Sequence, residues 1–247
     1  MQTCLSSSAA PDAQIGDLLA GVKRHGLSGL ELRVGDGHGL DAVCSGAALT
    51  AKATDIREAG VRVVALLDGS EASPPMWRRL VEILGTRLRL DGSLPLDERF
   101  SRARQATAAN VPVEVVVRGP EAAAEAQVVV AAGYNVVWEA HPSDPDLGKL
   151  AAHVLEAAGS RLAGVRLMGG GPESTLHEGR GFGTLMARLT LAGFGGTLVV
   201  APSDRKYHVL WDSWIGRRNA WGCGSAGSDS DTVAINHAGG TQGRQLA

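Results

Sequence analysis

The chain has 247 residues, of which 44% are hydrophobic and 20% charged, and its formal net charge is −2. This balance excludes a protein that binds nucleic acid through a bulk basic surface. No apolar run approaches the roughly 20 residues of a membrane span, and no secretory signal is evident at the amino terminus. With only Cys4, Cys44 and Cys223, neither a disulfide framework nor a thiolate zinc site is expected, so we expect a soluble, cytoplasmic protein.

Short apolar runs alternate along the chain with stretches of helical periodicity, and Gly, Pro, Asp or Asn stand at the joins. Strands are predicted at residues 3–6, 27–34, 61–68, 86–92, 113–118, 135–141, 162–168 and 196–202. Helices are predicted between and after them, at residues 14–25, 48–59, 76–84, 96–110, 121–132, 147–158, 183–192 and 205–217. The chain therefore reads as eight strand–helix units.

Eight such units favour an α/β fold of the (β/α)8 TIM barrel type, because eight parallel strands with right-handed crossovers close on themselves. A doubly wound open sheet also alternates, but it has fewer strands and often a glycine-rich turn after the first. Here the first strand is followed by Ser-Ser-Ser-Ala-Ala-Pro. We expect residues 1–220 to form one barrel domain and the Gly/Ser-rich residues 221–247 to form an irregular tail.

Charged side chains near the carboxyl ends of the predicted strands are the candidates for function, because barrel active sites lie at that end. Charges in apolar strands are costly unless they are paired or used. The candidate residues are Glu31, Arg33, Asp68, Arg118, Glu139, His141 and Arg166. They fit either a network of ion pairs in the barrel mouth or a binding site.

Several segments resemble the sugar phosphate isomerase/epimerase superfamily, which has the xylose-isomerase-like barrel. They are GLSGLELRVGDG, REAGVRVVALLDG and NVVWEAHPSD, followed by LHEGRG and LTLAGFGGTLVV. The resemblance covers roughly residues 3–214. It implies isomerisation or epimerisation of sugars and related polyols, and most members of the superfamily use a divalent metal.

The metal site of that superfamily is where this sequence departs. The superfamily pattern has a Glu ending strand five, an Asp near a His on strand six, a His on strand seven and a Glu on strand eight. Here Arg118 ends strand five, Met168 lies on strand seven, and Ala201 and Pro202 replace the last Glu. Only strand six, with Glu139 and then His141, provides residue types like those of the superfamily pattern. We therefore expect no bound metal; the alternative is a Mn, Mg or Zn site rebuilt from residues Glu173, His177, Glu178 or Asp204.

Without a metal site, we expect the strand ends to form a cavity rich in arginine. It is lined by Arg33, Arg118 and Arg166, with Arg89 as a possible addition. Guanidinium groups bind carboxylate or phosphate in a bidentate manner. The Gly-rich turn that includes Gly170 follows strand seven, where barrels often bind phosphate. Glu31 and Asp68 are expected to balance part of the charge and contact the substrate. Glu139 and His141 are expected to transfer protons.

Two functions follow from these residues. The first is an isomerase, epimerase or lyase that acts without metal on a small anionic or polyhydroxylated carbonyl compound. The second is a catalytically silent barrel that binds a sugar-like ligand or a protein partner. The expected partner is a small molecule, with no nucleic acid and no membrane, and a homodimer is left open.

Overall fold

The computed structural model describes residues 1–35, 38, 40, 46–68, 73–141, 144–169 and 180–202. The predicted helix at 205–217 and the tail at 221–247 lie outside these residues. The boundary between barrel and tail therefore stays a prediction.

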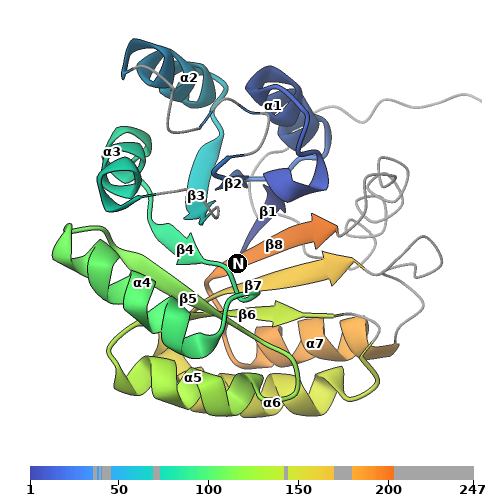
Figure 1. Ribbon diagram of the computed structural model, residues 1–247. Helices are drawn as coiled ribbons and strands as arrows, with labels where there is room; N and C mark the ends of the chain where they lie inside the picture. Colours follow the sequence, from blue (N-terminus) through green and yellow to red (C-terminus); the bar gives the residue numbers. More distant parts are fainter. Residues whose placement is uncertain are drawn as a thin grey trace, which may run out of the picture.

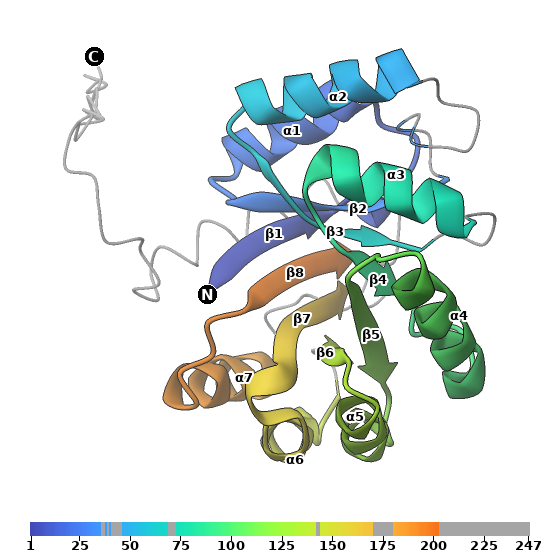
Figure 2. The same cartoon turned by 90° about the vertical axis from the view of Figure 1, so that its left-hand side faces the viewer.

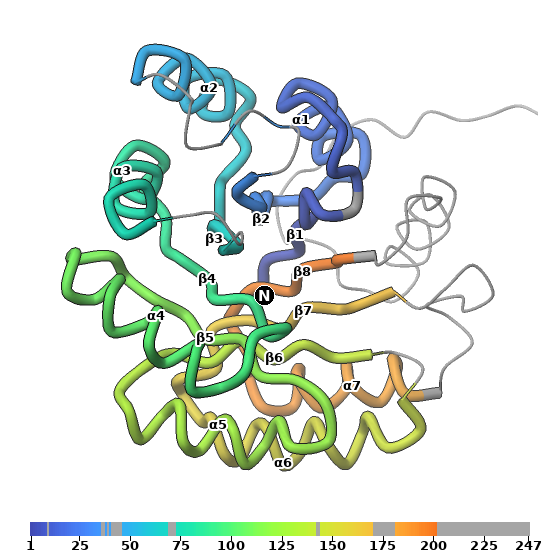
Figure 3. Tube along the Cα trace, viewed as in Figure 1, coloured from blue at the N-terminus to red at the C-terminus, as the bar shows by residue number. Residues whose placement is uncertain are grey.

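Eight parallel strands form a closed barrel in the order β1 to β8, and β8 pairs with β1 to complete the ring. Figure 3 traces the strands of this ring in chain order. The strands are β1 (Gln2–Ser6), β2 (Gly29–Arg33), β3 (Arg62–Leu67), β4 (Leu88–Leu90), β5 (Val113–Arg118), β6 (Asn135–Ala140), β7 (Leu162–Gly169) and β8 (Thr197–Pro202). The predicted (β/α)8 barrel is confirmed.

A helix follows each of the first seven strands and covers the outside of the barrel (Figures 1 and 2). The helices are α1 (Ile15–Arg24), α2 (Gly46–Glu58), α3 (Pro74–Leu84), α4 (Leu96–Ala108), α5 (Ala122–Ala131), α6 (Leu147–Ala158) and α7 (Arg180–Leu191). Two short 3-10 helices, η1 (Ser7–Ala9) and η2 (Gly159–Arg161), were not expected from the sequence.

The helices form because their apolar residues recur on one face. In α1 the residues Ile15, Leu18, Leu19 and Val22 are all buried, which is the spacing that places side chains on one side of a helix. Helix α3 begins with two prolines, a residue type that the first turn tolerates because its N–H groups have no partner within the helix. Each helix thus presents one apolar face to the strands.

Most of the apolar core lies between the strands and the helices. On β6, Val136, Trp138 and Ala140 belong to this outer core. Val137 and Glu139 alternate with them and therefore face the barrel interior. Apolar side chains in the interior include a small separate cluster of Cys4, Val64 and Val199. The interior thus holds polar and charged side chains at its centre.

Cys4 is the one cysteine among the described residues. Burial raises the pKa of its thiol to about 11, despite the opposing charge of Arg89. A thiol with such a pKa is a poor nucleophile near neutral pH. In the part of the chain that the structure describes, no helix has the length and apolar character needed to cross a membrane.

Candidate active site

Three of the predicted site residues meet inside the barrel. Arg166 on β7 donates from Nε to Glu31 on β2 at 3.1 Å and from Nη1 to Glu139 on β6 at 2.5 Å. All three side chains are buried, with at most 5% exposed. Arg166 and Glu139 are neighbours in the register of β6 and β7. Barrel closure brings Glu31 to them from far along the chain.

The same network continues toward β4 and β5. Arg89 on β4 donates to Glu31 at 2.5 Å and to Glu114 on β5 at 2.7 Å. Arg87, which is 41% exposed, binds the second oxygen of Glu114 at 3.1 Å. The interior network therefore contains three carboxylates and three guanidinium groups, and its formal charges cancel.

Electrostatics hold this network ionised in spite of its burial. Burial opposes ionisation of Glu31, but Arg166, Arg89 and the hydroxyl of Ser6 together hold its pKa below the ordinary value. Burial also opposes the charge of Arg89, but Glu114 and Glu31 raise its pKa above the ordinary value. A built Cβ on Gly164 would lie 2.7 Å from Thr197 Oγ1 and 3.3 Å from Arg89 Nη2. Glycine at this position therefore leaves room for the guanidinium group.

The interior network corrects the expectation that Arg166 needs a bound anion, because Glu31 and Glu139 already balance its charge. Whether Arg33, Arg118 and Arg166 share one cavity stays a prediction. Arg33 ends β2, where its backbone N–H donates to Ser7 Oγ at 2.8 Å. Arg118 lies at the end of β5, and Gly170 lies outside the described residues.

Asp68 follows β3 and joins two helices to the barrel. Its two oxygens accept hydrogen bonds from Trp77 Nε1 on α3 at 3.0 Å and from Arg102 Nη1 on α4 at 2.8 Å. Burial raises the pKa of this carboxyl, although Arg102 and Trp77 oppose the rise. Both oxygens of Asp68 thus already have a protein donor.

Arg118 and His141 lie on the wall of a cavity of about 580 Å³. We call it the β4–β5 cavity, because it opens between the loops that follow these strands. Its wall includes Gly92, Ser93, Arg118, Gly119, Glu121 and His141. Arg118 stands beside Glu139 in the register of β5 and β6, and His141 follows Glu139 by two residues. The cavity therefore adjoins the end of the interior network.

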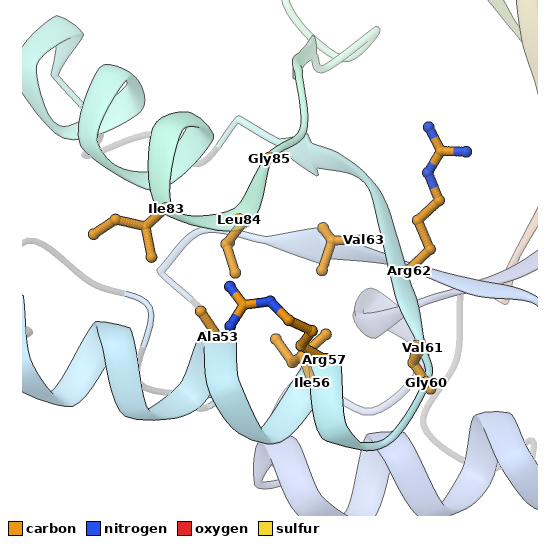
Figure 4. Close-up of a pocket in the computed structure, with 10 residues that line it drawn as sticks. All are labelled: Ala53, Ile56, Arg57, Gly60, Val61, Arg62, Val63, Ile83, Leu84 and Gly85. Carbon is orange, nitrogen blue, oxygen red and sulfur yellow. The ribbon is translucent and has the colours of Figure 1, made fainter.

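A second cavity, of about 280 Å³, lies at the other end of the barrel, where β3 begins (Figure 4). It lies between the carboxyl ends of α2 and α3. The side chain of Arg57 extends among Ala53, Ile56 and Leu84, while Arg62 points away (Figure 4). None of the predicted site residues lines this cavity.

The described residues do not fit the metal that the resemblance implies. In the part of the chain that the structure covers, no three His, Cys, Asp or Glu side chains are grouped to hold a metal ion. Glu139 has a guanidinium group at 2.5 Å, which repels a cation. Residues Glu173, His177, Glu178 and Asp204 lie outside the described residues. The expected absence of a metal stays a prediction.

Sequence reasoning missed Glu114 and left Arg89 as a marginal candidate. Glu114 is the one charged residue within the apolar run Val113–Val117, four residues before Arg118. Two-residue alternation places both residues on the same side of the strand. That pattern is the signal that could have identified Glu114 as an interior carboxylate.

The same barrel occurs in solved sugar epimerases. The structure of 3-keto-D-glucoside 4-epimerase from E. coli has a TM-score of 0.59 and 14% identity, with 88% of this chain and 99% of that chain covered. The two proteins share the (β/α)8 barrel fold. D-psicose 3-epimerase from Clostridium cellulolyticum matches at 0.59 and 14% identity, over 87% and 89% of the two chains. A xylose isomerase domain protein from Planctomyces limnophilus matches at 0.60 and 12%, over 89% and 94%.

These likenesses confirm the predicted fold, and identities this low show the fold alone. No family model matches the sequence, and no curated protein matches it.

Proposed function

We propose that the chain is an isomerase or epimerase that transfers a proton on a small polyhydroxylated or anionic carbonyl compound. The observation that carries this proposal is the placement of Glu139. Arg166 fixes its Oε2 at 2.5 Å, and its Oε1 receives no hydrogen bond from the residues that the structure describes. A fixed carboxylate with one open oxygen, at the end of a barrel strand, is suited to proton transfer. The neighbouring folds include sugar epimerases.

Glu139 and His141 carry out different proton transfers in the proposed reaction. Glu139 takes the proton from the carbon next to the carbonyl, and the electron pair of that C–H bond becomes the C=C bond of an enediol. His141 gives a proton to the carbonyl oxygen, because an imidazole exchanges protons near neutral pH. Glu139 then returns the proton to the neighbouring carbon of the enediol, while His141 takes the proton of the hydroxyl group that becomes the new carbonyl. Arg118 in the β4–β5 cavity holds a negative group of the substrate.

The proposed reaction uses no resident metal. The described residues that support this proposal are Arg118, Met168 and Ala201, which stand at strand ends where the superfamily pattern has ligands. Elemental analysis of the purified protein tests it. A stoichiometric Mn, Mg or Zn that is lost in Glu139→Gln would overturn it.

The alternative function is a silent barrel that binds a sugar-like ligand or a protein partner. The interior network favours it in one respect, because its charges pair with one another and need no substrate. The open Oε1 of Glu139 speaks against it, because a silent barrel would leave this oxygen without a function.

Deuterium exchange between D2O and substrate carbons separates the two functions. A panel of aldoses, ketoses, their phosphates and keto acids is incubated with the protein and followed by NMR. We expect exchange that falls at least about 100-fold in Glu139→Gln, the range for loss of a general base. His141→Ala should lower turnover more than affinity.

The exposed Glu58 provides the matched control, and Glu58→Gln should exchange at the wild-type rate. Exchange that is unchanged in Glu139→Gln would contradict the proposed role of this residue.

A further inference from the structure

The β4–β5 cavity has a positive group without a strong protein partner. Among the described residues, the only hydrogen bond of the Arg118 side chain is a long one, 3.5 Å from Nη2 to the carbonyl oxygen of Ser93. The side chain is exposed and forms no ion pair with them. Most donors of this guanidinium group are thus available to a ligand. His141 lies on the same wall.

Of the two carboxylates on the wall of this cavity, one is already neutralised. Glu125 on α5 receives a bidentate contact from the buried Arg99, at 2.9 and 3.0 Å. Glu98 on α4 is bound by Arg102 at 3.1 Å. Glu121 is exposed on the rim and has no such partner among the described residues. Of the carboxylates on the wall, Glu121 is thus the one whose charge opposes that of Arg118 for an incoming anion.

Two helices begin at the edge of the cavity. Pro95 and Leu96 at the start of α4 and Glu121 at the start of α5 belong to its wall. Neither helix start carries a side-chain cap. The first N–H groups of a helix without a cap carry partial positive charge. Acidic side chains also lie in these first turns, Asp97 and Glu98 in α4 and Glu125 in α5, of which Glu98 and Glu125 are paired with arginines.

The loop after β4 is shaped around the stem of Arg118. A Cβ built on Gly92 would lie 2.9 Å from Val116 Cγ1 and 3.4 Å from Arg118 Cδ. A side chain at position 92 would therefore press against Val116 on the strand and touch the arginine stem. Glycine lets the Arg118 stem lie against the loop, which holds its guanidinium group on the cavity wall.

From these observations we propose that the β4–β5 cavity binds the phosphate group of a phosphorylated substrate, with Arg118 as its main contact. The inference rests on the proposed function, because it names the substrate class of the same site. The phosphate lies off the barrel axis, between the starts of α4 and α5. The carbonyl end of the substrate then lies toward Glu139, the register neighbour of Arg118.

The arrangement of donors favours phosphate over carboxylate. Arg118 comes from β5, His141 follows β6, and the helix starts approach from α4 and α5. A tetrahedral phosphate has acceptor oxygens in all these directions, whereas a carboxylate has two oxygens in one plane.

Calorimetric titration of the full chain with methyl phosphate, inorganic phosphate and acetate, at fixed ionic strength, tests the proposal. We expect saturable binding of both phosphates and at least about fivefold weaker binding of acetate. Arg118→Gln should weaken the binding of methyl phosphate at least about tenfold. Glu121→Gln should strengthen it about twofold, because it removes the opposing charge.

Arg104 on the exposed side of α4 supplies the matched control, since Arg104→Gln makes the same change of charge away from the cavity. It should leave the affinity within about twofold of the wild-type value. Gly92→Ala should weaken the binding while Arg118 is still present. Binding of methyl phosphate that is unchanged in Arg118→Gln, or acetate bound as tightly as phosphate, would overturn the proposal.

The experiment also separates this proposal from the proposed function. Phosphate binding that depends on Arg118, with no deuterium exchange in any compound of the panel, would leave the subsite standing and refute the isomerase. Exchange that depends on Glu139 and is indifferent to Arg118 and to substrate phosphate would leave the isomerase standing and refute the subsite.

Discussion

The interior network and the β4–β5 cavity use the same residue types in opposite ways. In the network, Arg89 and Arg166 are at most 3% exposed and are bound by carboxylates at 2.5–3.1 Å. In the cavity, Arg118 is exposed and has one long hydrogen bond to a described residue. The difference shows that the arginines buried inside the barrel are neutralised by carboxylates, whereas the arginine at the end of β5 keeps its donors available to a ligand.

The largest expected effect is on the interior network. Arg89→Met would leave Glu31 and Glu114 buried without one of their cations. We expect a loss of about 3–5 kcal/mol in the free energy of unfolding, the cost of breaking a buried ion pair. Urea denaturation measures it, with Arg104→Met as the exposed control. A loss below about 1 kcal/mol would mean that the network does not stabilise the barrel.

A smaller effect is expected from Glu31→Gln, and it depends on pH. The pKa of Glu31 is lowered in the folded protein from its ordinary value of 4.5. Its ionised form therefore stabilises the fold above about pH 4.5, and this contribution is lost as the pH falls from there toward the lowered value. The cost of Glu31→Gln, about 1–3 kcal/mol near pH 7, should shrink as the pH falls below 4.5.

Urea denaturation at several pH values checks this, with Glu58→Gln as the exposed control. A difference between wild type and Glu31→Gln that stayed constant from pH 7 to pH 3 would show that the network does not hold Glu31 ionised.

The strands and helices could be predicted from the sequence because each has its own periodicity and ends at Gly, Pro or Asn. Strand β5 has the predicted bounds, Val113–Arg118. Strand β4 spans only Leu88–Leu90 where residues 86–92 were predicted. Pairing with its neighbours involves only the central residues of that run, and pairing is not visible in a single sequence.

The site could be predicted in part. Charged residues at strand ends identified Glu31, Glu139 and Arg166, and the ion-pair alternative anticipated their contact. The sequence could not tell which arginine would meet which carboxylate. Arg166 binds Glu31 across 135 residues, and the register of β2 and β3 shifts between Leu30 and Glu31. Such irregularities depend on packing, so which side chains meet in the interior follows only from the closed barrel.

The smallest expected change in stability is also the most direct test of the division between network and cavity. It is the free energy of unfolding of Arg118→Gln, measured in urea with and without methyl phosphate. Without the ligand, the variant should match wild type within about 0.5 kcal/mol, as exposed substitutions do. With the ligand, wild type should gain stability by mass action and the variant should gain much less. A variant destabilised by more than about 1.5 kcal/mol without ligand, or stabilised by methyl phosphate as strongly as wild type, would contradict the account.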